Sequence, residues 1–193
     1  MSNAEQFPIL LFATQQDWEM WLQEHHREPA GVWLKLAKRA MGVSSVSYQE
    51  ALESALCYGW IDGQKASFDE QYWLQKFTPR RPKSVWSQIN CEKAMALVAA
   101  GRMQAEGLRQ VELARADGRW DRAYASQSKA TVPDDLQSEL DKNPQAQAFF
   151  NTLNSVNRYA ILYRIQDAKR AETRAARIQK FIAMLERNEK LYP

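Results

Sequence analysis

The sequence predicts an α+β protein, with a small antiparallel sheet and helices in its N-terminal part and an all-helical C-terminal module. Short alternating apolar runs, which are typical of strands, occur within residues 32–77. Apolar residues at helical spacing fill most of the remaining chain. No tryptophan follows Trp120, although the chain contains seven. This change in composition sets the predicted boundary between domain 1–125 and domain 126–193.

The composition is that of an ordinary soluble globular protein. A chain of 193 residues can build one good core, or two small domains that share one. The hydrophobic content is 45% and the charged content 25%. A net charge of +3 is too small to indicate nucleic acid, and the apolar run 9–13 is too short to span a bilayer. The net charge therefore argues against a nucleic-acid partner without excluding one, and we expect no membrane insertion.

The chain contains two cysteines, Cys57 and Cys91. Its first six residues are polar and lack the basic segment of a secretory leader. These observations predict a cytoplasmic protein with both thiols free. The alternative is a disulfide that closes the segment between them.

The first part of the chain predicts strands and helices in alternation. Residues 7–12 are typical of a short strand or a buried arm. Thr14 followed by Asp17 indicates the start of a helix over 15–26, and the alternation in 32–38 indicates a strand. One face of that helix carries Trp18, Trp21, Leu22 and His25.

A second helix and a hairpin follow. Ser47 and Glu50 form a capping box, and Gly59 ends the helix that it opens. Residues 60–62 and 72–77 are predicted to be two strands of a hairpin, with the turn passing through Gly63, Ser67 and Asp69. Together with the strand over 32–38 they make a small antiparallel sheet, which the first two helices cover.

The remaining segments are predicted to be helices. One predicted helix is capped by Asn90 and ends at Gly101. Another runs over 104–116 and ends at Gly118. A polar linker spans 125–131. Beyond it, Pro133 suits the first position of a helix, Asn143-Pro144 indicates a break, and Ser155 indicates a new helix start. The last helix is predicted over 168–189.

Two stretches resemble a known family. One combines Cys57-Tyr58-Gly59-Trp60-Ile61-Asp62-Gly63 with Arg80-Arg81-Pro82-Lys83-Ser84-Val85-Trp86-Ser87 and Asn90, and it is similar to the amino-terminal signature of the YdeI/OmpD-associated, "bacteriocin-protection" (OmdA) family. The other, Ala168-Lys169-Arg170-Ala171-Glu172-Thr173-Arg174-Ala175-Ala176-Arg177-Ile178, is similar to that family's carboxy-terminal helical module. Gly101-Arg102-Met103 and Gly118-Arg119-Trp120 fall where its intervening motifs are expected. The resemblance implies resistance to bacteriocins or antimicrobial peptides and a link to an outer-membrane porin, and it brings no catalytic residues with it.

The sequence contains no pattern for a metal, a cofactor or a classical hydrolase. His25 and His26 are adjacent, so on a helix they point about 100° apart and do not grip one ion. The two cysteines lack CxxC spacing. No Gly-x-Ser-x-Gly elbow or glycine-rich phosphate loop is present. We expect no metal site, no cofactor and no catalytic residue.

The segment around Arg80 and Arg81 predicts an anion site. A guanidinium supplies a planar fork of donors, and an indole ring supplies a flat apolar wall. The predicted ligand-binding residues here are Trp60, Asp62, Trp73, Arg80, Arg81, Trp86, Ser87 and Asn90. The alternative is a solvated charged loop. For Asp62 the alternatives are a turn-shaping role and an ion pair with Arg80 or Arg81.

The last helix adds three arginines to this prediction. Helical geometry places Arg170, Arg174 and Arg177 in a row beside an apolar stripe, where an anion or a carboxylate would neutralise them. The stripe consists of Ala168, Ala171, Ala175, Ile178, Ile182 and Leu185. The alternative to a ligand is an ion pair with Glu172, Asp62 or Asp167.

These observations predict a non-catalytic binding protein with a basic aromatic cleft. Its ligand would be a small anion or an acidic segment of a partner protein. Two alternatives stay open. One is a nucleic-acid-binding protein, whose aromatic rings would stack on bases. The other is an enzyme that uses Asp62 or Glu172 on an anionic substrate held by arginine.

Overall fold

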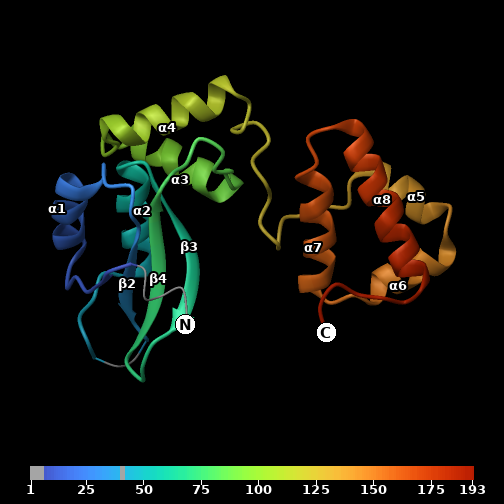
Figure 1. The fold of residues 1–193 in the computed structure, drawn as a ribbon, viewed down its shortest axis with the longest axis horizontal. Coiled ribbons are helices and arrows are strands. Elements are labelled where there is room, and N and C mark those ends of the chain that lie inside the picture. Colours follow the sequence, from blue (N-terminus) through green and yellow to red (C-terminus); the bar gives the residue numbers. More distant parts are fainter. Residues whose placement is uncertain (1–6, 40–41) are drawn as a thin grey trace. The chain divides into compact units, whose positions relative to one another are not determined.

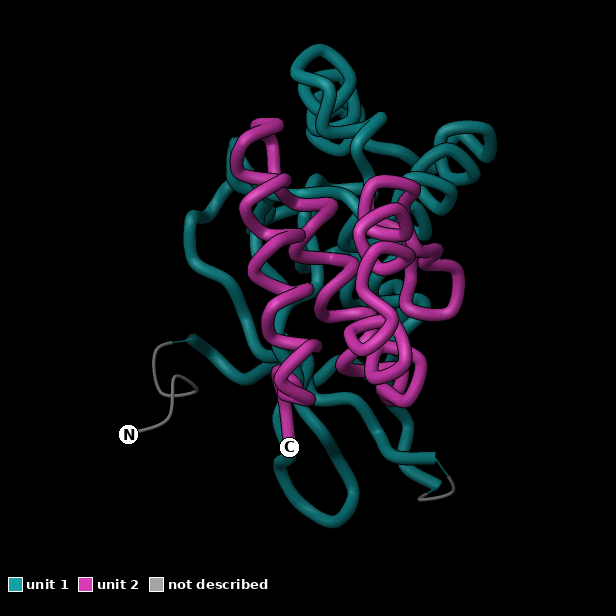
Figure 2. The backbone as a smooth tube through the Cα atoms, turned by 90° about the vertical axis from the view of Figure 1, so that its right-hand side faces the viewer, with its two compact units in different colours: residues 1–123 teal, residues 124–193 magenta. Residues whose placement is uncertain are grey.

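The computed structural model describes residues 7–39 and 42–193. The polar start on which the cytoplasmic prediction rests, residues 1–6, lies outside the described residues. The chain divides into two compact units, Met1–Ala123 and Tyr124–Pro193 (Figure 2). Each unit has a hydrophobic core of its own.

The first unit is built on a four-stranded sheet in the order β1-β2-β4-β3 (Figure 1). Its strands are β1 (Ile9–Leu10), β2 (Val32–Ala37), β3 (Trp60–Ser67) and β4 (Tyr72–Pro79). β4 pairs antiparallel with both β2 and β3, which confirms the predicted sheet. β1 adds a short strand that is parallel to β2.

The hairpin is longer than the sequence predicted. β3 continues to Ser67, so Gly63 and Ser67 lie in the strand and not in the turn. The turn forms around Asp69, whose Oδ1 accepts hydrogen bonds from the backbone N–H groups of Gln71 and Tyr72. The pairing register shifts between Asp62 and Lys65. Such a bulge interrupts the alternation that would have indicated a continuous strand.

The first two helices of this unit contribute to its core, and both begin as predicted. α1 (Gln15–His25) starts with a capping box at Thr14, and α2 (Tyr48–Cys57) starts with one at Ser47. Gly59 follows α2 with φ = 76°, a conformation that glycine adopts without strain. The largest fully buried side chains of the first unit are Trp18, Leu22, Leu34, Leu36, Leu56, Trp60, Phe77 and Trp86.

Two more helices complete the first unit, α3 (Gln88–Ala99) and α4 (Ala105–Ala116). The cap of α3 is Ser87, whose Oγ accepts a hydrogen bond from the backbone N–H of Asn90. The prediction that Asn90 is the cap was therefore wrong. The Ser87 hydroxyl accepts the hydrogen bond of the Asn90 N–H, so Asn90 already lies in the first turn of the helix. α4 lies so close to the end of α2 that a Cβ on Gly107 would clash with the carbonyl oxygens of Leu56 and Cys57.

The second unit consists of helices, which confirms the predicted C-terminal module. They are α5 (Asp134–Asp141), α6 (Pro144–Thr152), α7 (Ser155–Gln166) and α8 (Ala171–Glu186). α8 is shorter than the predicted span 168–189. Ala171 and Ala175 of the predicted stripe are exposed, and the buried face consists of Ile178, Phe181, Ile182 and Leu185. Within the described residues, no helix combines the length and the apolar character needed to span a bilayer.

A candidate ligand-binding site beside Trp73

Three strands place a half-buried indole at one end of the sheet. Trp73 on β4 is paired with Leu36 of β2 on one side and with Ser67 of β3 on the other. Directly paired residues share a face of the sheet, and so do residues two apart in a strand. Lys65 therefore lies on the same face as Ser67 and Trp73. Because Leu36 on this face is buried in the core of the first unit, this is the face of the sheet that packs against the core.

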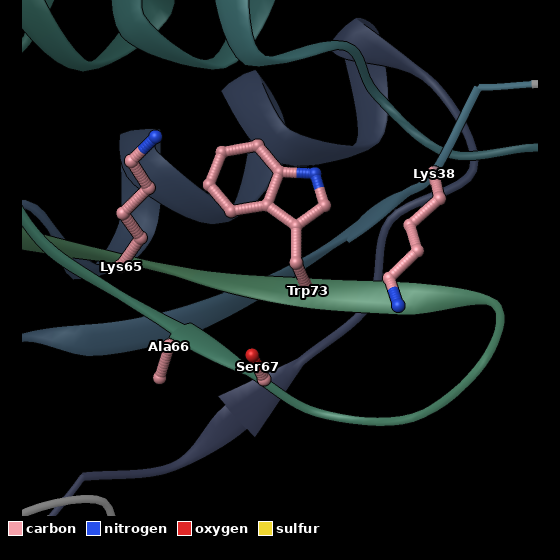
Figure 3. Close-up of a pocket in the computed structure, with 5 residues that line it drawn as sticks. All are labelled: Lys38, Lys65, Ala66, Ser67 and Trp73. Atoms are coloured by element: carbon pink, nitrogen blue, oxygen red, sulfur yellow. The ribbon is translucent and has the colours of Figure 1, made fainter.

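A pocket of about 350 Å³ is lined by Lys38, Lys65, Ala66, Ser67 and Trp73. Figure 3 shows the indole of Trp73 between the side chains of Lys65 and Lys38, with Ser67 on the neighbouring strand. The Lys65 ammonium nitrogen lies 5.9 Å from the centre of the Trp73 ring. The Lys38 ammonium donates a hydrogen bond to the carbonyl oxygen of Asp69, at 2.8 Å, which fixes it at the turn of the hairpin.

The pocket is basic. In the part of the chain that the structure describes, neither Lys38 nor Lys65 forms an ion pair with a carboxylate. Two ammonium groups and the Ser67 hydroxyl are donors for an anion, and the indole face suits a flat apolar group. Convergent polar groups on an apolar surface are typical of a small-molecule site.

A hydrogen-bonded pair lies next to this pocket. The ring of Tyr48, at the start of α2, lies 6.1 Å from that of Trp73. Its hydroxyl donates a hydrogen bond of 2.8 Å to Asp62 Oδ2 on β3. In the described residues Asp62 forms no ion pair with Arg80 or Arg81, so the ion-pair alternative for Asp62 was wrong. A phenol from α2 satisfies the carboxylate instead.

Arg80 is part of the core and not of an open loop. Its side chain is 6% exposed and stacks on Trp86, which is 2% exposed. One of its nitrogens donates to the carbonyl oxygen of Val85, at 3.1 Å. Arg81 is exposed, and its backbone N–H donates to the hydroxyl of Ser84. The two adjacent arginines therefore do not form one guanidinium fork.

The three tryptophans that were expected to wall one cleft occupy three different places. Trp60 is fully buried, and its ring N–H donates to the carbonyl oxygen of His26, at 2.9 Å. It packs edge-on against Trp18 and Trp21. Trp86 lies under Arg80, and Trp73 lines the pocket described above. Ser87 and Asn90 form the first turn of α3.

The arginine row belongs to the second unit, and carboxylates neutralise two of its members. Arg174 makes two hydrogen bonds to Asp135, at 2.5 and 2.8 Å. Arg177 pairs with Asp167, as the alternative predicted, and also donates to the carbonyl oxygen of Arg164. Arg170 is exposed and precedes α8.

Groups suited to nucleophilic or metal chemistry are few. Both cysteines are free, as predicted, and burial raises the pKa of each thiol to about 11, so both are protonated at neutral pH. His25 stacks flat on Trp21 at 4.4 Å. Across residues 7–39 and 42–193, no three side chains of the metal-binding types cluster together.

The sequence argument missed Lys38, Lys65 and Ser67. Segment 63–69 was predicted to be a turn, where exposed lysines and serines are unremarkable. A strand continuing to Ser67 would have placed Lys65 and Ser67 on one face opposite Trp73. The full length of the hairpin would have indicated this placement. The bulge interrupts the alternation from which that length is predicted, so the sequence did not show it.

Comparisons with known proteins agree with this division of the chain. Residues 10–110 match a family model described as "Domain of unknown function (DUF8412)". Residues 129–188 match the model described as "Bacteriocin-protection, YdeI or OmpD-Associated" (OmdA). Because the first match spans more than half of the 193 residues, the chain belongs to that family, and it carries an OmdA domain in its helical unit. No curated protein and no solved structure was found to match the chain.

Proposed function

We propose that this chain is a non-catalytic binding protein whose Trp73 pocket takes a small anion attached to a flat ring. One observation carries the proposal. Two lysines that lack a carboxylate partner among the described residues lie beside a half-buried indole. The ring of the ligand would pack on Trp73, and its anionic group would meet Lys65.

The size of the pocket limits the ligand. A volume of about 350 Å³ is near the lower end for small-molecule sites, so a single ring with one carboxylate or phosphate fits and a dinucleotide does not. The Ser67 hydroxyl adds a neutral donor or acceptor at the rim.

Calorimetric titration of the full chain with benzoate and with neutral benzamide tests the charge requirement. The two probes share a ring and differ in charge, so we expect benzoate to bind at least ten times more tightly. Lys65→Met and Trp73→Leu should each weaken benzoate binding by about tenfold, which corresponds to about 1.4 kcal/mol. Lys83→Met, at an exposed position, is the charge-matched control. Equal affinities for the two probes, or equal effects of Lys65→Met and Lys83→Met, would refute the proposal.

The description of the OmdA family supports extending the proposal to bacteriocin protection. The two free thiols fit a reducing compartment such as the cytoplasm. Cells that lack the protein should survive a bacteriocin better when they are given the unaltered chain than when they are given the Trp73→Leu variant. Equal survival with the two chains would show that the Trp73 pocket is not needed for bacteriocin protection.

A further inference from the structure

The helical unit contains a second pocket, of about 330 Å³. Its apolar lining includes Leu153 and Leu162. Its polar lining comes from Gln127 and from the first turns of α7, which supply Ser155 and Arg158. All of these residues belong to the second unit, so the pocket is separate from the site beside Trp73.

Arg158 differs from three of the other arginines of this unit. Carboxylates neutralise Arg174, Arg177 and Arg187. Among the described residues, by contrast, Arg158 has no carboxylate partner. Its Nη2 donates to the carbonyl oxygens of Phe150 and Asn151, and these bonds are long at 3.4 and 3.3 Å. A half-buried guanidinium that lacks a counter-charge favours an anion in the adjoining pocket.

The start of α7 adds positive potential to the same pocket. Asn154 caps this helix by accepting the backbone N–H of Asn157. The Ser155 hydroxyl stands at the first helical position, where the helix dipole favours negative charge. The cation at Arg158 and the helix terminus therefore both favour an anion in a pocket that also has apolar lining residues.

We propose that this pocket binds a carboxylate carried on a short branched apolar group. The carboxylate would meet Arg158 and Ser155, and the apolar group would pack on Leu153 and Leu162. Two sources share this chemistry, a free branched-chain acid and the C-terminal residue of a peptide. A peptide would supply an amide in addition, and the side chain of Gln127 can bond to it.

NMR titration of the ¹⁵N-labelled full chain with three probes tests this inference. N-acetyl-leucine mimics a peptide C-terminus, 4-methylpentanoate is the free acid, and N-acetyl-leucinamide is the neutral isostere. We expect both acids to shift the amide signals of α7, with at least tenfold weaker binding of the amide. Tighter binding of N-acetyl-leucine identifies a peptide C-terminus as the ligand, and equal binding of the acids identifies a free acid. Equal binding of N-acetyl-leucine and its amide overturns the proposal.

Two variants separate binding from folding. Arg158→Gln should weaken N-acetyl-leucine at least tenfold. Arg164→Gln, which removes the same charge from a residue that bonds to Ala160 and Tyr192, should change it less than twofold. Ser155→Asp places a negative charge at the first position of the helix, so thermal stability should be kept or raised while binding is lost. Unchanged binding in a folded Ser155→Asp protein, or equal losses in the two arginine variants, contradicts the assignment.

Discussion

The guanidinium carbon of Arg80 lies 3.4 Å from the centre of the Trp86 ring, and both side chains are buried. The Trp120 ring packs 5.0 Å from the ring of Trp86. Arg81, the next residue in the chain, is exposed. Two arginines that look alike in sequence therefore differ in role, because one is packed in the core of the first unit and the other is solvated.

This difference predicts unequal stability effects. Arg80→Ala should lower the free energy of unfolding of the first unit by at least about 2 kcal/mol, since it removes the stack on Trp86 and a charged hydrogen bond to Val85. Arg81→Ala should change it by no more than about 0.5 kcal/mol. Urea denaturation followed by tryptophan fluorescence measures this, because no tryptophan lies beyond Trp120. Equal effects of the two substitutions would contradict the burial of Arg80.

Gly107→Ala is expected to lower the stability of the first unit, which is the opposite of what helix propensity alone predicts. Alanine is normally about 1 kcal/mol better than glycine inside a helix. At this position a Cβ would lie 2.8 Å from the carbonyl oxygen of Leu56, so Gly107→Ala should destabilise the first unit by about 1–3 kcal/mol. Gly63→Ala is the control, since the nearest atom to its Cβ would be 3.7 Å away. The same denaturation measurement compares them, and a stabilising Gly107→Ala would show that α4 does not approach α2 so closely.

Much of the fold could be predicted because its signals are local. The capping boxes at Thr14 and Ser47 involve residues three apart, and the glycines that end helices need only their own backbone conformation. The extent of β3 could not be predicted. It depends on pairing with β4 across a bulge, and that pairing is a property of two strands.

The candidate site was less predictable than the fold. Sequence identifies Trp60, Trp73 and Trp86 as large aromatic residues but does not say which of them packing removes from the surface. Trp60 is fully buried, and Trp86 has a guanidinium over it. Trp73 reaches a pocket because it lies near the end of the sheet, where β3 supplies Lys65 and Ser67. This placement follows from the register and is absent from any single stretch of the chain.

The ion pair between Asp135 and Arg174 predicts an acid-sensitive contribution to the second unit. Hydrogen bonds from Arg174 lower the pKa of Asp135. The stabilisation is therefore present above the unfolded pKa of about 3.9 and is lost as pH falls through the folded pKa. Asp135→Asn should cost at most about 1 kcal/mol at pH 6, because the pair is partly exposed, and the variant should approach the unaltered chain as pH falls through the folded pKa of Asp135. Far-UV circular dichroism in urea measures both.

Asp134→Asn is the control for that prediction. Asp134 neighbours Asp135 in the first turn of α5 and forms no ion pair with a described residue. Its loss should cost only a few tenths of a kcal/mol through the helix dipole. If the two variants lost equal stability at pH 6, the pairing with Arg174 would contribute nothing.

Cys57 predicts a loss of stability at alkaline pH. Its side chain is 3% exposed, and burial raises the pKa of its thiol to about 11. In the unfolded chain the thiol ionises near a pKa of about 8.5, so between these values the unfolded state binds fewer protons than the folded state. Stability is therefore fully present below about pH 8.5 and falls as pH rises toward 11.

Comparison with Cys57→Ala isolates this effect, since the lysines and tyrosines that titrate in the same range are common to both proteins. The stability advantage of the unaltered chain over Cys57→Ala should shrink by on the order of 2 kcal/mol between pH 8 and pH 11 in urea denaturation followed by fluorescence. Parallel curves for the two proteins would mean that the thiol ionises equally in both states, and hence that Cys57 is not desolvated in the fold.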